Sequence, residues 1–186
     1  RLRELGDAEV LILASLPDLH SLVLSDATYE SDGESRITTE GMAALGRHGK
    51  LTSLDLSYLP LDDTLIDPLR EAKRLQRLDL RGTQVGDEGM KAIGRIATLE
   101  ELNLSRTELS ATGLAHLTGL KDLQRLDLEE THVAGDALAL LAEFPKLREL
   151  NLASRLLTDA AIPHVAKLPN LQQLRLSARH GAKLTD

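Results

Sequence analysis

One spacing limits this chain more than any other feature, because the pattern LxxLxL returns at a constant 24-residue step. The pattern begins with "LTSLDL" at Leu51, and further copies start at Leu75, Leu99, Leu123, Leu147 and Leu171. An earlier copy, "LHSLVL", starts at Leu19, and its unit is longer because eight extra residues interrupt it. Five equal intervals in succession identify an internal repeat, and periods of this length are typical of solenoid folds.

The first part of each unit predicts a strand. In "LDL" at Leu78 to Leu80, apolar and polar residues alternate, and this period of two places both leucines inward while Asp79 faces solvent. A strand and a helix within one such short unit cannot bury a core alone, so the units must stack on one another. We expect parallel strands about 4.8 Å apart, with the wider helices outside, so that the stack curves and the sheet lines its concave side.

The second part of each unit predicts a helix. Met90, Ile93 and Ile96 recur every three residues, as the buried face of a helix does. We expect a helix of about ten residues after each strand. Asp87 stands at the start of this stretch, where a carboxylate accepts hydrogen bonds from the free N–H groups of the helix.

These motifs resemble leucine-rich repeats in the variant LxxLxLxxTx(V/L)xDxG(L/M)xxLxxLxx. The variant is similar to the Thr-containing repeats of bacterial, notably planctomycete, proteins and more distantly to the ribonuclease-inhibitor type. The clearest copy, "LQRLDLRGTQVGDEGMKAIGRIAT", runs from Leu75 to Thr98, whereas two copies carry Leu59 or Arg155 in place of the threonine, and we expect a less regular turn there. The resemblance implies an α/β leucine-rich repeat solenoid, a curved right-handed βα superhelix with parallel strands on the concave face and short helices on the convex face.

The resemblance covers essentially the whole chain and implies a single leucine-rich repeat domain over residues 1-186. We divide it into a partial repeat at 1-18, repeats starting at 19, 51, 75, 99, 123 and 147, and a partial repeat at 171-186. Both ends of the sequence fall inside a repeat, and neither carries a recognisable polar cap. Because a solenoid needs capping repeats over its terminal cores, we expect this chain to be a fragment of a longer one.

Composition excludes several classes of function. A net charge of -7 argues against a general nucleic-acid or anionic-membrane binder, which needs clustered Lys and Arg. The chain has no cysteine, so a disulfide framework, a thiolate nucleophile and a thiolate zinc site are excluded. No apolar run approaches the ~20 residues that span a bilayer. Phosphate-binding, HExxH and GxSxG motifs are also missing, so we expect no enzyme, no cofactor and no metal site. The absence of cysteine fits a reducing compartment, and we expect a location in a bacterial cytoplasm.

The register assigns outward strand positions to rows. One row alternates in charge between neighbouring repeats: Arg77, Glu101, Arg125 and Glu149. We expect ion pairs along it, each contributing roughly 0–1 kcal/mol. The central row places Asp55 beside Asp79. A third row is also counted as outward: Ser25, Ser57, Arg81, Ser105, Glu129, Ala153 and Ser177. Two interpretations stay open: a self-neutralised polar grid that keeps the solenoid in solution, or a recognition surface.

The interruption after Leu19 follows its strand directly and lies on the rim that leads into the helix. It is acidic and contains Tyr29, while Tyr58, the other tyrosine of the chain, lies one repeat further along the same rim. Tyrosine is enriched at interface hot spots, although a rim is also where an insertion costs least. The candidate partner-binding residues are Tyr29, Asp32, Glu34, Asp55, Tyr58, Asp79, Arg81, Asn103, Arg106, Asp127 and Glu129.

These observations predict a non-catalytic protein-protein interaction scaffold, acting as a monomer. A mixed, non-basic concave surface suits a protein or peptide partner better than nucleic acid. The scaffold would bind this partner through the concave sheet and the strand-to-helix rim. The alternative is a ligand-sensing or substrate-recruiting module of a larger bacterial signalling protein or enzyme, whose catalytic domain lies outside this chain.

Overall fold

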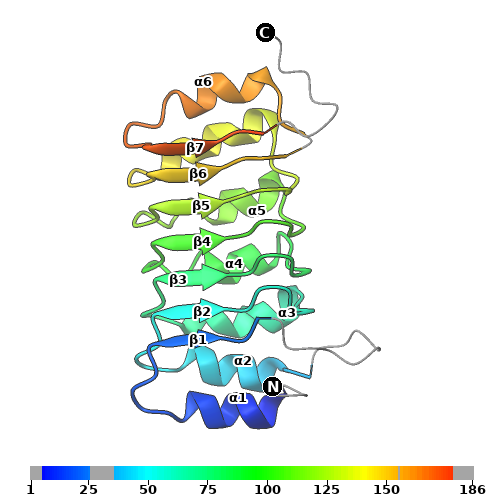
Figure 1. Ribbon diagram of the computed structural model, residues 1–186, viewed down its shortest axis with the longest axis vertical. Coiled ribbons are helices and arrows are strands. Elements are labelled where there is room, and N and C mark those ends of the chain that lie inside the picture. The colour runs from blue at the N-terminus through cyan, green and yellow to red at the C-terminus, as the bar shows by residue number, and fades with distance from the viewer. Residues whose placement is uncertain (1–5, 26–35, 155, 178–186) are drawn as a thin grey trace.

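The computed structural model describes residues 6–25, 36–154 and 156–177 of the chain (Figure 1). Seven parallel strands form one sheet in the order of the sequence. Each strand has three residues: β1 (Ser21–Val23), β2 (Ser53–Asp55), β3 (Arg77–Asp79), β4 (Glu101–Asn103), β5 (Arg125–Asp127), β6 (Glu149–Asn151) and β7 (Gln173–Arg175). The helices cover one side of this sheet (Figure 1): α1 (Asp7–Ala14), α2 (Thr39–Gly46), α3 (Asp63–Ile66), η1 (Asp67–Glu71), α4 (Gly89–Ile93), α5 (Ala111–His116), η2 (Gly135–Glu143), η3 (Asp159–Ala161) and α6 (Ile162–Val165).

The strands pair at equivalent positions of successive units. Leu54 pairs with Leu78, its equivalent in the next unit, and Leu22 pairs with Leu54 across the longer unit. The eight extra residues therefore leave the register of the sheet unchanged. Leu78 and Leu80 are 2% and 0% exposed, which confirms the predicted inward face of the strand.

The predicted helix length is wrong, although the predicted buried face is confirmed. Met90, Ile93 and Ile96 are all buried, but α4 spans only five residues. Other units use 3₁₀ geometry, as in η2 with nine residues. A spacing of three residues is the period of a 3₁₀ helix, and each short unit must also supply a strand and two connections. The helices are therefore shorter and tighter than expected.

The turn after the strand closes with the same backbone hydrogen bond with or without its threonine. Three buried threonine hydroxyls donate to the backbone carbonyl three residues earlier, at 2.7, 2.6 and 2.8 Å: Thr83, Thr107 and Thr131. Leu59 is equally buried, and its N–H donates to Leu56 at 3.3 Å, as that of Thr83 does to Leu80 at 3.2 Å. Backbone bonds therefore close this turn without a threonine. The chain directly after it does differ, because the Leu61 N–H donates to Leu59 at 2.8 Å, a bond that is not seen at Thr83, Thr107 or Thr131. Arg155 lies outside the described residues.

Asp87 does not cap its own helix, contrary to the prediction. Its carboxylate accepts hydrogen bonds from the backbone N–H (2.8 Å) and the hydroxyl (2.5 Å) of Ser110, the N-cap of α5 in the next repeat. Burial alone would raise the pKa of Asp87, but the bonds from Ser110 and Gly113 outweigh burial and hold the pKa below its ordinary value. Asp63 likewise accepts the N–H of Gly86 at 2.7 Å. Each of these aspartates therefore joins its own repeat to the following one.

A glycine makes room for each of these aspartates. A Cβ added to Gly41 would lie 2.4 Å from Oδ1 of Asp7, which also accepts the Gly41 N–H at 3.2 Å. Two further pairs are built in the same way, with distances of 2.7 and 2.4 Å to the added Cβ: Gly89 with Asp63, and Gly113 with Asp87. Where the preceding repeat carries Thr39, Ala111 or Gly135 instead of aspartate, the glycine position holds Leu65, Ala137 or Ala161. Aspartate and glycine thus form one structural unit that spans two repeats.

We expect Gly41→Ala to lower the free energy of unfolding by about 1–3 kcal/mol, because the new methyl group collides with Asp7. The double variant Asp7→Ala, Gly41→Ala has no collision. Its loss of unfolding free energy should therefore be smaller than the sum of the losses in the two single variants. Urea denaturation of the four proteins measures this coupling. Ala137→Gly is the control, with a loss of only about 0.5–1 kcal/mol from backbone freedom. Additive effects of the two substitutions would contradict the paired role.

Candidate interaction surface

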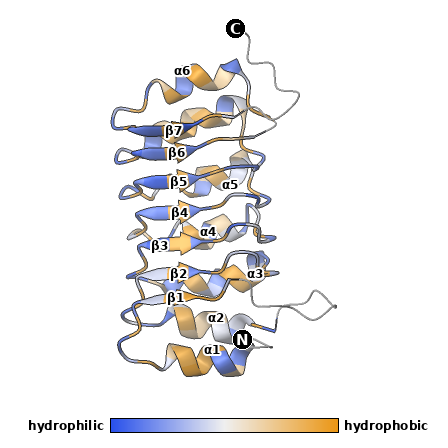
Figure 2. Cartoon of the chain, in the orientation of Figure 1, coloured by the Kyte–Doolittle hydropathy of each residue, from blue (hydrophilic) through white to orange (hydrophobic). Residues whose placement is uncertain are grey.

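The uncovered face of the sheet is hollowed into a groove of about 470 Å³ that runs from Val23 on β1 to Arg175 on β7. Figure 2 shows hydrophilic residues recurring along the strands of this face. The charged residues that line the groove are five acids and three arginines: Asp55, Asp79, Glu101, Asp127, Glu149, Arg77, Arg125 and Arg175. This surface, which we call the groove, is therefore polar and has a small acidic excess.

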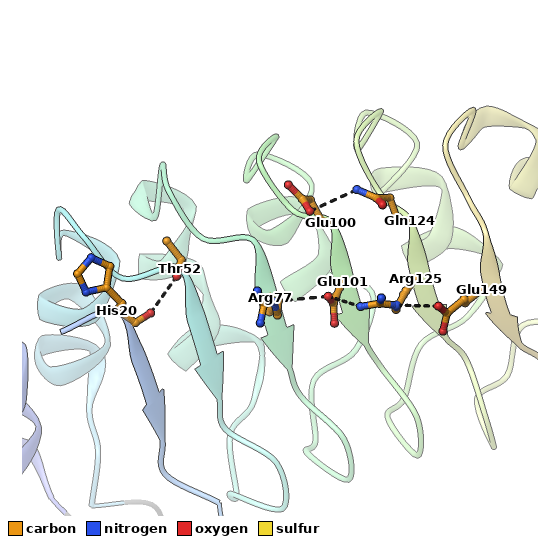
Figure 3. Close-up of polar contacts among 8 residues, drawn as sticks. All are labelled: His20, Thr52, Arg77, Glu100, Glu101, Gln124, Arg125 and Glu149. Atoms are coloured by element: carbon orange, nitrogen blue, oxygen red, sulfur yellow. Dashed lines mark hydrogen bonds and ion pairs between the residues drawn. The ribbon is translucent and has the colours of Figure 1, made fainter. Parts of the chain in front are cut away.

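The charged row predicted along the strands is confirmed (Figure 3). Nε of Arg77 lies 3.4 Å from Glu101, Arg125 contacts the same carboxylate, and Nε of Arg125 lies 2.9 Å from Glu149. The hydrogen bond to Glu149, followed by the charges of Glu101 and Glu149, raises the pKa of Arg125. The arginines are exposed and the glutamates are partly exposed, so each pair contributes at most about 1 kcal/mol. The charges of this row nevertheless neutralise one another.

The central row closes a turn at the end of each strand. In five repeats the side-chain oxygen accepts the backbone N–H two residues later, at 2.8–3.1 Å: Asp55, Asp79, Asn103, Asp127 and Asn151. Two asparagines also donate to the aspartate of the preceding strand, Asn103 to Asp79 at 3.0 Å and Asn151 to Asp127 at 3.1 Å. Two of the three aspartates therefore have an asparagine partner within the groove.

Asp55 departs from this pairing. Its neighbour across the sheet is Asp79, another aspartate, and its Oδ2 accepts no hydrogen bond from any residue that the structure describes. The row that carries arginines further along holds Ser53 here. Val23 occupies the central position on β1 and is 63% exposed, where other repeats carry polar side chains. The β1 end of the groove therefore combines two adjacent carboxylates with an exposed apolar side chain.

The environment of Asp79 disfavours its charged form. Burial raises the pKa of Asp79, and the nearby charge of Asp55 raises it further. The N–H of Arg81, the side chain of Asn103 and the charge of Arg81 act in the opposite direction without cancelling the rise. The folded protein therefore ionises Asp79 at a cost in stability that is present at neutral pH and absent when the group is protonated.

The prediction that the third row faces outward is only partly right, because three of its seven residues are buried. Ser57, Ser105 and Ala153 are buried, because they lie inside the turns that the central row closes. Arg81 and Glu129 of the same row are partly exposed. Arg81 and Glu129, the two predicted partner-binding residues of this row, therefore reach the surface. The buried residues between and beside them do not contribute to that surface.

The rim is formed by the residues in left-handed backbone conformation after the strands: Tyr58, Gly82, Arg106 and Glu130. Tyr58 is 46% exposed, and its ring lies over Gly82, where an added Cβ would lie 2.6 Å from the ring. The guanidinium of Arg81 lies 5.7 Å from the ring centroid, within cation–π range. The ring of Tyr58 therefore contacts both Gly82 and Arg81 of the next repeat.

Three predicted residues, Tyr29, Asp32 and Glu34, lie outside the described residues, so the proximity of Tyr29 to Tyr58 stays a prediction. Sequence reasoning missed the roles of Val23 and Gly82. The signal for Val23 was present, because it is the apolar member of a row whose other residues are polar. The support that Gly82 gives to the ring depends on a contact between repeats, and no pattern within one repeat reveals it.

No group of three His, Asp or Glu side chains in the described ranges is arranged to hold a metal ion. Within the same ranges, none of the helices has the length and apolar character needed to cross a membrane.

We expect Asp55→Asn to stabilise the folded protein by up to about 1 kcal/mol at pH 7, because the repulsion between Asp55 and Asp79 is removed. The amide oxygen of asparagine can still accept the Ser57 N–H. The pKa of Asp79 is raised above the ordinary value of 3.8, so Asp79 is protonated at lower pH, the repulsion is lost and the gain should vanish. Thermal denaturation between pH 3 and pH 7 tests this, and a gain that does not depend on pH would contradict it.

Comparison with known proteins agrees with this geometry. A family model described as leucine-rich repeat matches residues 74–94 and 96–117, which lie in successive repeats. No curated protein sequence matches the chain. Among solved structures, internalin C2 from Listeria monocytogenes is similar, with a TM-score of 0.59 and 23% sequence identity, over 89% of this chain and 74% of that chain. The repeat signature and the stacked parallel strands together make this protein a leucine-rich repeat solenoid.

Proposed function

We propose that this chain is a non-catalytic scaffold that binds a protein or peptide partner through the groove and the rim. The observation that carries the proposal is the groove itself, an open surface lined by side chains from all seven strands. In the central row, side-chain oxygens accept the backbone N–H two residues later, and ion pairs link the side chains of the neighbouring row. These interactions hold the side chains in place. A surface fixed before binding loses little conformational freedom when a partner arrives.

The rim supports the same function. Tyr58 is a half-exposed aromatic side chain held by Gly82 and Arg81, and such rigid aromatic groups dominate many protein interfaces. Arg106, two repeats further along the rim, is exposed as well. A partner seated in the groove would reach both side chains from the same side of the molecule.

The charges of the groove favour binding over catalysis. Arg125 is engaged by two glutamates, and Asp79 and Asp127 each accept a hydrogen bond from an asparagine. A catalytic site brings a nucleophile, a base and a group that orients the base into contact. The groups in the groove instead bind one another across equivalent positions of the repeats, which suits a recognition surface.

Arg125→Trp should weaken partner binding strongly, because it places a bulky ring at the middle of the groove. The matched control is Arg95→Trp, the same change at an exposed position outside the groove. Proteins captured from a lysate of the source organism are quantified by mass spectrometry for both variants and the wild type. We expect at least a ~10-fold loss of specific partners for Arg125→Trp alone, equivalent to about 1.4 kcal/mol. Equal recovery by both folded variants would reject the groove as the binding surface.

Tyr58→Ala tests the rim separately. Loss of the ring should weaken capture of the same partners by a factor of about ten or more, as expected for a hot-spot aromatic residue. Tyr58→Phe keeps the ring and its contact with Gly82 and should retain most of the binding. If Tyr58→Ala and the wild type recover the same amounts while both give the same circular dichroism, the rim takes no part in binding.

A further inference from the structure

We propose that the partner presents a lysine or arginine side chain, within an extended basic segment, to the β1 end of the groove. There Val23, Asp55 and Asp79 lie at equivalent positions of three adjacent strands. The inference rests on the proposed function, because it assigns a chemical character to the partner of that same surface. We refer to these three residues as the acidic end of the groove.

Charge complementarity is the first argument. Along β3 to β6 the row of Arg77, Glu101, Arg125 and Glu149 is neutral as a whole and is tied together by ion pairs. On β1 and β2 the same row holds Ser21 and Ser53, so no arginine of that row stands beside Asp55. The groove as a whole has five acids against three arginines, an excess of two negative charges. The acidic end therefore offers a partner two adjacent carboxylates. Of the arginines next to Asp79, Arg77 is paired with Glu101, and the charge of Arg81 does not cancel the rise in the pKa of Asp79.

Geometry is the second argument. Asp55 and Asp79 stand in register on paired parallel strands, which lie about 4.8 Å apart. A guanidinium or ammonium group between them can donate hydrogen bonds to both carboxylates, and charge-assisted bonds of this kind are stronger than neutral ones. Oδ1 of Asp55 accepts the Ser57 N–H, and its Oδ2 accepts no hydrogen bond from the residues that the structure describes.

The exposed valine supplies a third, independent argument. Val23 is 63% exposed and follows Asp55 directly across the sheet. Lysine and arginine carry a long aliphatic stem that packs on apolar surface while the charged head reaches a carboxylate. An apolar side chain next to two carboxylates therefore matches both the stem and the head of such a residue. A small inorganic cation would gain nothing from contact with an apolar side chain.

Energetics point the same way. At the matching positions of other repeats an asparagine stands beside each aspartate, as Asn103 does beside Asp79. The acidic end keeps two carboxylates together instead, and the raised pKa of Asp79 reports the resulting cost, in which burial is the larger part. A cation bound between them would turn repulsion into attraction. The other repeats avoid such repulsion between neighbouring carboxylates. A local loss of stability of this kind is typical of binding sites.

A divalent metal ion is the competing occupant. Calcium takes six to eight oxygen ligands and magnesium demands octahedral geometry, whereas the acidic end offers two carboxylates, each already accepting a backbone N–H. An organic cation needs fewer contacts and uses the valine. Metal binding is therefore tested as an outcome that would overturn the inference.

The test measures fluorescence anisotropy of a labelled, blocked peptide of alternating lysine and serine at low ionic strength. Asp55→Asn should weaken its binding at least about threefold, in line with the loss of one partly exposed charge pair. Asp136→Asn removes the same charge at an exposed position on η2 and should leave the affinity unchanged. Val23→Lys, which places an ammonium group of the chain itself beside Asp55, should weaken binding further. A peptide of alternating glutamate and serine should not bind.

Two results would overturn the inference. Equal affinities of Asp55→Asn and Asp136→Asn for the lysine peptide would show that only overall charge attracts it. A rise in melting temperature with calcium or magnesium alone, seen in the wild type and lost in Asp55→Asn, would identify a metal site instead. Failure of the proposed function is recognised separately: if Arg125→Trp captures every partner of the wild type, the groove is not the interface, whatever the peptide does.

Discussion

The hydrogen bonds between equivalent backbone positions of successive repeats are the interaction on which every other feature depends. The N–H of Leu56 donates to the carbonyl of Asp79, and that of Leu80 to Asn103, both at 2.9 Å. With only three residues per strand, one unit has too little pairing to persist alone. Stacking supplies a neighbour on each side, buries the leucines between units and repeats the same geometry at each step.

This geometry imposes a rule on side chains. Each strand position of the repeat meets its own equivalent about 4.8 Å away, so like charges in one row repel unless the sequence alternates them or inserts a neutral residue. The outer row follows the rule by alternating Arg77, Glu101 and Arg125, and the central row follows it by placing Asn103 and Asn151 beside aspartates. The pair of Asp55 and Asp79 is meaningful because it breaks a rule that its neighbours obey.

What the sequence predicts well is whatever depends on the period alone. The inward leucines, the parallel register and the ion pairs of Arg125 all follow once the step between repeats is known. The acceptor role of Asp87 could not be foreseen in the same way, because its partner Ser110 belongs to the next repeat. The burial of Ser105 depends on a turn after the strand, where the alternation of inward and outward residues ends. A comparison of aspartate with glycine one repeat later would have revealed the link between repeats.

The left-handed residues of the rim have a further consequence. Gly82 adopts this conformation without penalty, whereas a residue with a side chain accepts a backbone cost of about 1 kcal/mol, and Tyr58, Arg106 and Glu130 all do so. The turn itself needs none of these side chains, because its N–H bonds to the next repeat form in all four cases. Substitutions at these positions can therefore replace an aromatic, basic or acidic group on the rim without altering the scaffold, which lets a lineage revise its specificity while its architecture is preserved.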